Sequence, residues 1–311
     1  MLIGSNDKSK EDFSTVSIGK DITLEGWSGI FINQNNNTAY GVRVNLDGKI
    51  KAVDDISGST GIGIYVNGKI SNQENAPIIN ISSTSKIQST GVGIYSAGYA
   101  EYYINGAHIE GIESGLGIKS GYFNILDGTI LGTGEDKTPA NSNNNGINPT
   151  GVAIQIESNP GYTGNIDLSI KNGLIQSNNS NVIYEYTINN GPSQVQDINI
   201  SGGKFISKSN KSVFLLSQNF SNNLNNFITG GKFSSDPTKY LKSGFKVELD
   251  NNNLYEVINN NTSVFKYNGE SNNKNLLPYF TIISLIIIVI VSYLNRSKIK
   301  QISKKFFPKL Y

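Results

Sequence analysis

The side chains of this chain that could do chemistry are a few acids, a single histidine and, ahead of the last forty residues, a single arginine. Adjacent acids occur at Asp54-Asp55 and at Glu135-Asp136. Two carboxylates on one face could hydrolyse a glycosidic bond, one as acid and the other as base or nucleophile. In an extended chain, however, neighbouring side chains point to opposite faces. We therefore interpret both pairs as solvated loop residues.

The sequence offers no other catalytic or metal-binding arrangement. The histidine, His108, lies in a pattern that we expect to face solvent, and the sequence suggests no partner that would orient it. The absence of cysteine excludes disulfides, thiolate metal sites and cysteine nucleophiles. We predict no catalytic residue, no metal and no cofactor.

Charge is distributed unevenly along the chain. All 24 acidic residues lie at or before Glu270, whereas seven of the 26 basic residues follow it. The larger part is therefore mildly acidic and holds Arg43 as its arginine. Such a surface does not attract a phosphate backbone, so we exclude nucleic acid as a partner.

Two short phrases recur along the sequence and predict strands. The first, which we call the first ladder, recurs at intervals of 22 to 36 residues as AYGVRV (from Ala39), GIGIYV (Gly61), GVGIYS (Gly91), GLGIKS (Gly115), GVAIQI (Gly151), NVIYEY (Asn181) and SVFLLS (Ser212). The second ladder lies between its members as GKIKA (Gly48), SKIQS (Ser85), AHIEG (Ala107), GTILG (Gly128), GLIQS (Gly173), GKFIS (Gly203) and GKFSS (Gly231).

The alternation within these phrases indicates which side chains face the core, because strand residues two apart share a face. In the first ladder we expect inward pairs at Tyr40 and Val42, Ile62 and Ile64, Val92 and Ile94, Leu116 and Ile118, Val152 and Ile154, Val182 and Tyr184, and Val213 and Leu215. In the second ladder we expect Ile50, Ile87, Ile109, Ile130, Ile175, Phe205 and Phe233.

Like residues at like positions predict an all-β fold, a right-handed parallel β-helix solenoid of about seven turns. A β-propeller needs about 40 residues or more per repeat, which is longer than these intervals. An antiparallel sandwich would not explain why equivalent residues recur in equivalent phrases.

The outward face of the first ladder carries the candidate ligand-binding residues, which are Arg43, Tyr65, Tyr95 and Lys119. Beside them runs a row of glycines at 41, 63, 93 and 117, which we expect to leave a flat floor. Tyrosine rings bordering such a floor could stack on sugars. The alternative is that tyrosine simply suits a strand.

The phrases ISGGKF and ITGGKFSSDPTKYLKSGFKVELDNNNLYEV resemble the Gly-Gly-x-Phe β-helix repeats in surface proteins of low-GC Gram-positive bacteria and their relatives. The resemblance implies a fold like that of the pectate-lyase superfamily. It also implies a signal peptide before the repeats and, after them, a Leu-Pro-x-Thr-Gly sorting signal, an apolar span and a basic tail. Here Leu277-Pro278-Tyr279-Phe280-Thr281 lacks the glycine of that signal.

Residues 276–294 form an apolar stretch that is long enough to span a bilayer as a helix. The basic tail after it is expected to stay in the cytoplasm, with the larger part outside. The chain begins without a secretory signal, so we expect its start to be truncated; a cytoplasmic tail-anchored protein is the alternative. The predicted regions are an N-terminal cap or first strands (1–37), the β-helix (38–236), a C-terminal cap (237–258), a polar stalk (259–275), the transmembrane helix (276–294) and the basic tail (295–311).

Two classes of function follow from the sequence. The first is a membrane-anchored bacterial surface protein that displays its β-helix for adhesion, structure or glycan binding, with membrane lipid and a polysaccharide or host surface as partners. The second is a polysaccharide lyase or glycoside hydrolase of the same fold. An acidic or basic cluster spanning neighbouring turns would favour the second class.

Overall fold

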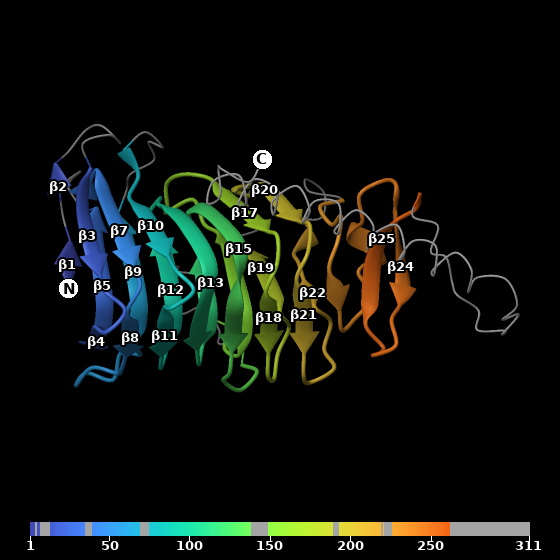
Figure 1. Ribbon diagram of the computed structural model, residues 1–311, viewed down its shortest axis with the longest axis horizontal. Helices are drawn as coiled ribbons and strands as arrows, with labels where there is room; N and C mark the ends of the chain where they lie inside the picture. The colour runs from blue at the N-terminus through green and yellow to red at the C-terminus, as the bar shows by residue number, and fades with distance from the viewer. Residues whose placement is uncertain are drawn as a thin grey trace, which may run out of the picture. The chain divides into compact units, whose positions relative to one another are not determined.

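The computed structural model describes residues 1–261 with the exception of residues 4, 7–12, 35–38, 69–74, 138–148, 189–192, 219 and 221–225. The regular elements among these described residues are almost all β-strands, and a short 3-10 helix lies at Thr238–Tyr240. Figure 1 shows the strands succeeding one another roughly in chain order, from β3 near the N-terminus to β24.

One sheet has eight strands. In spatial order they are β1 (Leu2–Ile3), β5 (Ser28–Gln34), β9 (Ile62–Gly68), β12 (Val92–Ala97), β14 (Ser114–Ile118), β16 (Val152–Ser158), β19 (Ile183–Thr187) and β22 (Phe214–Leu215). Every neighbouring pair in this sheet is parallel.

The other large sheet has fifteen strands in two arms, which share the long strands β13 (Glu101–Gly111) and β15 (Gly121–Gly132). One arm adds β3 (Ser14–Ile18), β7 (Val42–Leu46), β10 (Ile78–Ile81), β17 (Ile166–Ile170) and β20 (Val195–Ile200). The other arm adds β4 (Thr23–Gly26), β8 (Lys49–Ala52), β11 (Lys86–Ser89), β18 (Leu174–Ser177), β21 (Lys204–Ser207), β23 (Lys232–Phe233) and, at its far end, β25 (Tyr255–Asn259) and β24 (Phe245–Leu249).

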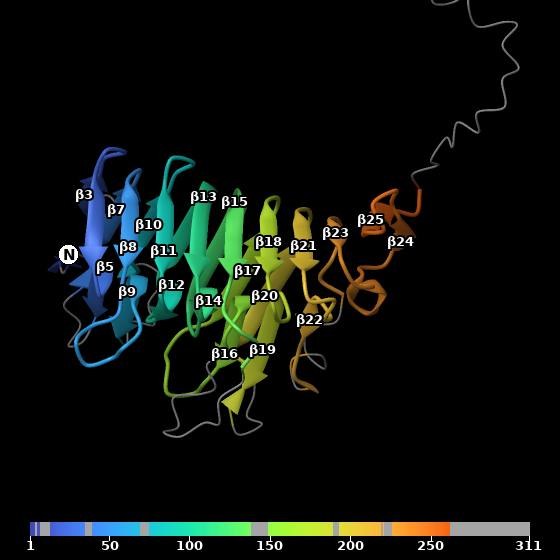
Figure 2. The same ribbon diagram turned by 90° about the horizontal axis from the view of Figure 1, so that it is seen from below.

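Figure 2 shows the eight-stranded sheet along one side of the molecule and the larger sheet along the other. The short strands β2 (Ser5–Asn6) and β6 (Ala39–Tyr40) form a separate parallel pair. At the far end, β24 (Phe245–Leu249) and β25 (Tyr255–Asn259) form an antiparallel hairpin, and β25 also pairs antiparallel with β23. Parallel strands in chain order, with helix nearly absent from the described part, are compatible with a β-helix-like fold.

The second ladder is confirmed along its whole length. The register places Ile50 beside Ile87, Ile87 beside Ile109, and so on to Phe205 beside Phe233. All seven side chains are at most 1% exposed. The rings of Phe205 and Phe233 stack with centroids 4.8 Å apart. Each layer thus stacks like on like within the core, as the sequence predicted.

The first ladder is confirmed in its centre and corrected at its ends. Strand β9 pairs parallel with β12, with Ile62 opposite Val92 and Ile64 opposite Ile94. Val42, however, lies on β7 in the larger sheet. The strand that pairs with β9 at the position expected for the phrase AYGVRV is β5, which the recurring phrases did not predict. Both sheets bury alternating aliphatic residues, so the pattern alone did not distinguish them.

Two further differences concern the later turns of the first ladder. Leu116 lies opposite Ile94 rather than Val92, a shift of two residues that keeps every side chain on its expected face. In β19 and β22 the facing is inverted, so that Leu215 is exposed and Phe214 is buried. Two consecutive residues, Val182 and Ile183, are both buried where β19 begins, and this breaks the alternation.

The predicted membrane segment (276–294) and the basic tail (295–311) lie outside the described residues. Within the described part of the chain, no helix is both long and apolar enough to cross a membrane.

Candidate functional site

The four residues predicted to bind a ligand separate onto two surfaces. Tyr65 on β9 and Tyr95 on β12 lie opposite each other in the eight-stranded sheet, and Lys119 directly follows β14 in that sheet. Arg43 lies on β7 in the larger sheet, where its register partners are Thr15 and Ile78. The structure therefore brings three of the four together and places Arg43 elsewhere.

Tyr65 and Tyr95 belong to an aromatic row that begins with Phe31 on β5. Phe31 and Tyr65 stack with ring centroids 4.9 Å apart and planes 15° apart, and Tyr65 and Tyr95 are 5.4 Å apart. Trp27 packs edge-on against Tyr65 at 6.3 Å. Phe31 and Tyr65 therefore cover one face of each other, whereas the plane of the Tyr95 ring is tilted by 53° to that of Tyr65. Phe31 and Trp27 were not predicted to belong to this row, because β5 is not among the members of the first ladder recognised in the sequence.

The expected glycine floor is absent from this face. A Cβ built on Gly63 would lie 2.4 Å from Cγ2 of Ile87, and one on Gly93 would lie 2.7 Å from Cγ2 of Ile109. Both glycines therefore make room for the isoleucines of the second ladder, within the core. Gly117 lies beneath the ring of Tyr95, where a Cβ would be 3.1 Å from Cδ2.

Lys119 is buried, although the alternation places it on the outward face. Its side chain is 2% exposed, and its Nζ lies 3.1 Å from Oε2 of the fully buried Glu157. The Lys119 Nζ also lies 5.4 Å from the ring centroid of Tyr95 and 5.0 Å from that of Tyr162. Burial raises the pKa of the Glu157 carboxyl, and it raises the pKa of Tyr162 to about 12. Tyr162 comes from the turn after β16 and closes over the pair, which no local sequence signal predicts.

A second outward surface runs across the larger sheet as a row of polar side chains at one register. We call it the polar row, and it consists of Ser17, Asn45, Asn80, Tyr103, Asn124, Ser169 and Asn199. Each of these residues is partly or fully exposed. Arg43 lies two residues from Asn45 on the same face of β7. The polar row lies outside both ladders, so the recurring phrases of the sequence did not predict it.

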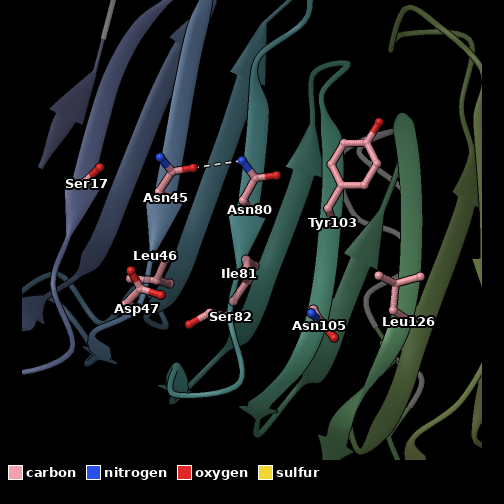
Figure 3. Close-up of a pocket in the computed structure, with 10 residues that line it drawn as sticks. All are labelled: Ser17, Asn45, Leu46, Asp47, Asn80, Ile81, Ser82, Tyr103, Asn105 and Leu126. Atoms are coloured by element: carbon pink, nitrogen blue, oxygen red, sulfur yellow. Dashed lines mark hydrogen bonds between the residues drawn. The ribbon is translucent and has the colours of Figure 1, made fainter. Parts of the chain in front are cut away.

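The first four members of the polar row line a cavity of about 490 Å³, which is shown in Figure 3. Asn80 Nδ2 donates a hydrogen bond of 2.8 Å to Asn45 Oδ1, and the carbonyl of Asn80 is directed away from Asn45. The hydroxyl of Tyr103 donates to Glu101 Oε2 at 3.1 Å, and burial raises the pKa of Tyr103 to about 12. Among the described residues that line the cavity, Asp47 alone carries a charge.

The acids named from the sequence have structural roles, which confirms their interpretation as loop residues. Asp55 accepts hydrogen bonds from the backbone of Ser57 and Ser59 within a turn. Asp136 accepts from Ser180 and pairs with Lys211.

A carboxylate pair that the sequence analysis did not single out lies at the far end of the larger sheet. Asp167 on β17 and Asp197 on β20 are register partners. Burial, and then the charge of Asp197, raise the pKa of Asp167. In the described part of the chain, no three histidine, cysteine or acidic residues gather where they could hold a metal ion.

His108 lies in the predicted solvent-facing column between Lys86 and Thr129. The structure supplies a partner that the sequence did not suggest, because Nε2 of His108 lies 3.1 Å from Oε2 of Glu110. The two residues are two apart on β13 and therefore share a face.

The outward surfaces thus hold an aromatic row that is partly covered and a polar row that is open to a ligand. Comparison of the chain with protein-family models, curated proteins and solved structures gave no match.

Proposed function

We propose that this chain is a membrane-anchored bacterial surface protein that binds an extended glycan along the polar row. In this proposal the described strands form a right-handed parallel β-helix of about seven turns, related to the pectate-lyase-like surface repeats that the sequence resembles. The hairpin β24–β25, which extends to Asn259, caps the β-helix. The stalk then begins after β25 and continues to residue 275, and the helix 276–294 holds the protein in the membrane with the basic tail inside.

The observation that carries the glycan proposal is the polar row with its cavity. Amide and hydroxyl groups both donate and accept hydrogen bonds, which suits the hydroxyl groups of sugars. Neighbouring strands lie about 4.8 Å apart, so the row repeats the same kind of group at short, regular steps. A polymer that repeats its own hydroxyl groups can contact several strands in succession. The nearly uncharged lining favours a neutral polysaccharide.

The paired amides leave binding groups unused. Because Asn80 Nδ2 donates to Asn45 Oδ1, the Nδ2 of Asn45 and the Oδ1 of Asn80 remain available to a ligand. Further along the row, Oδ1 of Asn124 is a buried acceptor to which no described residue donates a hydrogen bond. This atom is not exposed on the surface, so we do not count it among the groups that would bind the glycan.

The double variant Asn45→Ala/Asn80→Ala is expected to bind a neutral polysaccharide about tenfold more weakly, since two hydrogen bonds contribute about 0.5–1.5 kcal/mol each. Binding of the purified full chain in detergent to a panel of immobilised neutral polysaccharides would measure this. Gln88→Ala, on an exposed position of the other arm, is the matched control and should bind normally.

Tyr65→Ala examines the aromatic row in the same assay. Loss of binding in Tyr65→Ala with full binding in Asn45→Ala/Asn80→Ala would move the site to the eight-stranded sheet. Absence of binding to every polysaccharide tested would contradict the glycan proposal. Release of reducing ends or unsaturated sugars would instead favour the enzyme class, with Asp167 and Asp197 as the first residues to replace.

The membrane orientation has its own test. Protease added to intact cells is expected to remove the β-structure while sparing an epitope attached after Tyr311, because the basic tail holds the C-terminus inside. Detergent lysis should then expose the epitope. Protection of the β-structure until lysis would identify a tail-anchored cytoplasmic protein and contradict the surface location.

A further inference from the structure

A buried lysine, glutamate and asparagine meet at the end of strands β14 and β16. Ile118 and Ile156 are register partners, so the following residues, Lys119 and Glu157, also lie opposite each other. Lys119 Nζ lies 3.1 Å from Glu157 Oε2, and Asn159 Nδ2 donates to Glu157 Oε1 at 3.0 Å. One carboxylate therefore contacts both the amine and the carboxamide.

These three groups are held away from water. Lys119, Glu157 and Asn159 are 1%, 0% and 6% exposed, and the rings of Tyr95 and Tyr162 flank the amine. Two charges are costly in such a place, and transfer of one proton from the lysine to the glutamate makes both groups neutral. A neutral lysine amine is a nucleophile.

We propose that Lys119 and Asn159 become joined by an intramolecular amide bond, with Glu157 as the group that transfers the protons. The Nζ of Lys119 attacks Cγ of Asn159, and a new carbon–nitrogen bond forms. Glu157 takes a proton from Nζ and passes a proton to Nδ2. The bond between Cγ and Nδ2 then breaks, and ammonia leaves. The carboxyl group is regenerated and no oxidant or reductant is consumed.

The surrounding residues favour this reaction over simple ion pairing. The backbone N–H of Gly161 donates to Asn159 Oδ1 at 2.9 Å, where it would stabilise the negative charge that develops on that oxygen. Gln194 fixes the same turn, because its Oε1 accepts from the Asn159 N–H at 2.7 Å and its Nε2 donates to the Tyr162 carbonyl at 2.9 Å. Exclusion of water protects the intermediate from side reactions.

The lysine amine has two possible targets, the Glu157 carboxylate and the Asn159 carboxamide, and the carboxamide is the better electrophile. A carboxylate resists attack by an amine because it carries a negative charge and lacks a good leaving group. The carboxamide of Asn159 is neutral and already has its nitrogen hydrogen-bonded to the group that can protonate it. The bond would tie the ends of two neighbouring parallel strands, β14 and β16, across the long connection between them.

Intact-mass spectrometry of the purified full chain tests this directly. We expect a mass lower than the sequence mass by one molecule of ammonia, and peptide mapping should find the Lys119 peptide joined to the Asn159 peptide. Glu157→Gln, which keeps the shape of the side chain, should lack the link. Lys51→Met, which removes an exposed lysine paired with Glu25, should retain it.

Other results would overturn the proposal. One is a wild-type mass equal to that of the sequence. Another is loss of water with a link between Lys119 and Glu157. A third is loss of ammonia that maps only to asparagine–glycine steps, such as Asn105-Gly106, where a succinimide can form without Lys119. A link that persists in Glu157→Gln would remove Glu157 from the reaction. Because the wild-type peptide map is decisive alone, a variant that fails to fold does not weaken the test.

Discussion

Replacing Ile87 with aspartate is expected to lower the free energy of unfolding by about 5 kcal/mol, which is enough to unfold many domains of ordinary stability. Ile87 is fully buried on β11 between Ile50 and Ile109. Its Cγ2 fills the space left by Gly63. The substitution both empties that space and places a carboxylate among aliphatic side chains, where no described residue could pair with it.

Lys86→Asp is the matched control for this variant. Lys86 precedes Ile87 on the same strand, faces solvent and lies between Lys49 and His108. An aspartate there remains hydrated, so the expected change is within about 0.5 kcal/mol. Urea unfolding followed by circular dichroism would compare the two variants. Similar losses of stability in both would show that the register of β11 is wrong.

The success of the second ladder explains what the sequence could predict. Every member has an aliphatic or aromatic residue at its centre and glycine or serine at one end or both, and four of the seven have polar residues on both sides of the central residue. The period and the inward position are therefore easy to recognise. The first ladder is less clearly marked. A two-residue shift between β12 and β14 leaves the facing unchanged, so the pattern of Val92, Ile94 and Leu116 cannot reveal it.

Part of the candidate site was predictable because alternation along a strand shows which side chains share a face. The alternation of side chains correctly predicted that Tyr65 and Tyr95 lie beside each other on the outward face, since the position of a residue in its strand decides which face it occupies. It could not reveal that Lys119 is buried, because Tyr162 covers it from a turn that follows two intervening strands. Nor could it assign Arg43 to the other sheet, because both sheets have the same alternation. Burial by a distant turn depends on tertiary packing, which local patterns do not encode.

Glu157→Leu and the double variant Lys119→Met/Glu157→Leu should differ strongly in stability. The single variant leaves the amine of Lys119 buried without its carboxylate, and breaking a buried pair in this way costs about 3–5 kcal/mol. The double variant replaces both groups with apolar side chains of similar size and removes that cost. In the single variant, contacts of the Lys119 ammonium with the Tyr95 and Tyr162 rings offset about 1 kcal/mol of the cost of the unpaired charge. We therefore expect the double variant to be the more stable by about 3 kcal/mol.

This comparison does not depend on the proposed cross-link, because Glu157 is missing from both variants and neither could form it. The exposed pair of Glu25 and Lys51, with side chains more than half exposed, supplies the control. Glu25→Leu and Lys51→Met/Glu25→Leu should differ by no more than about 1 kcal/mol, since water already solvates both charges. Unfolding of all four variants in urea measures the two differences. Equal stability of Glu157→Leu and its double variant would mean that water reaches Lys119, and the closed environment on which its reaction with Asn159 depends would not exist.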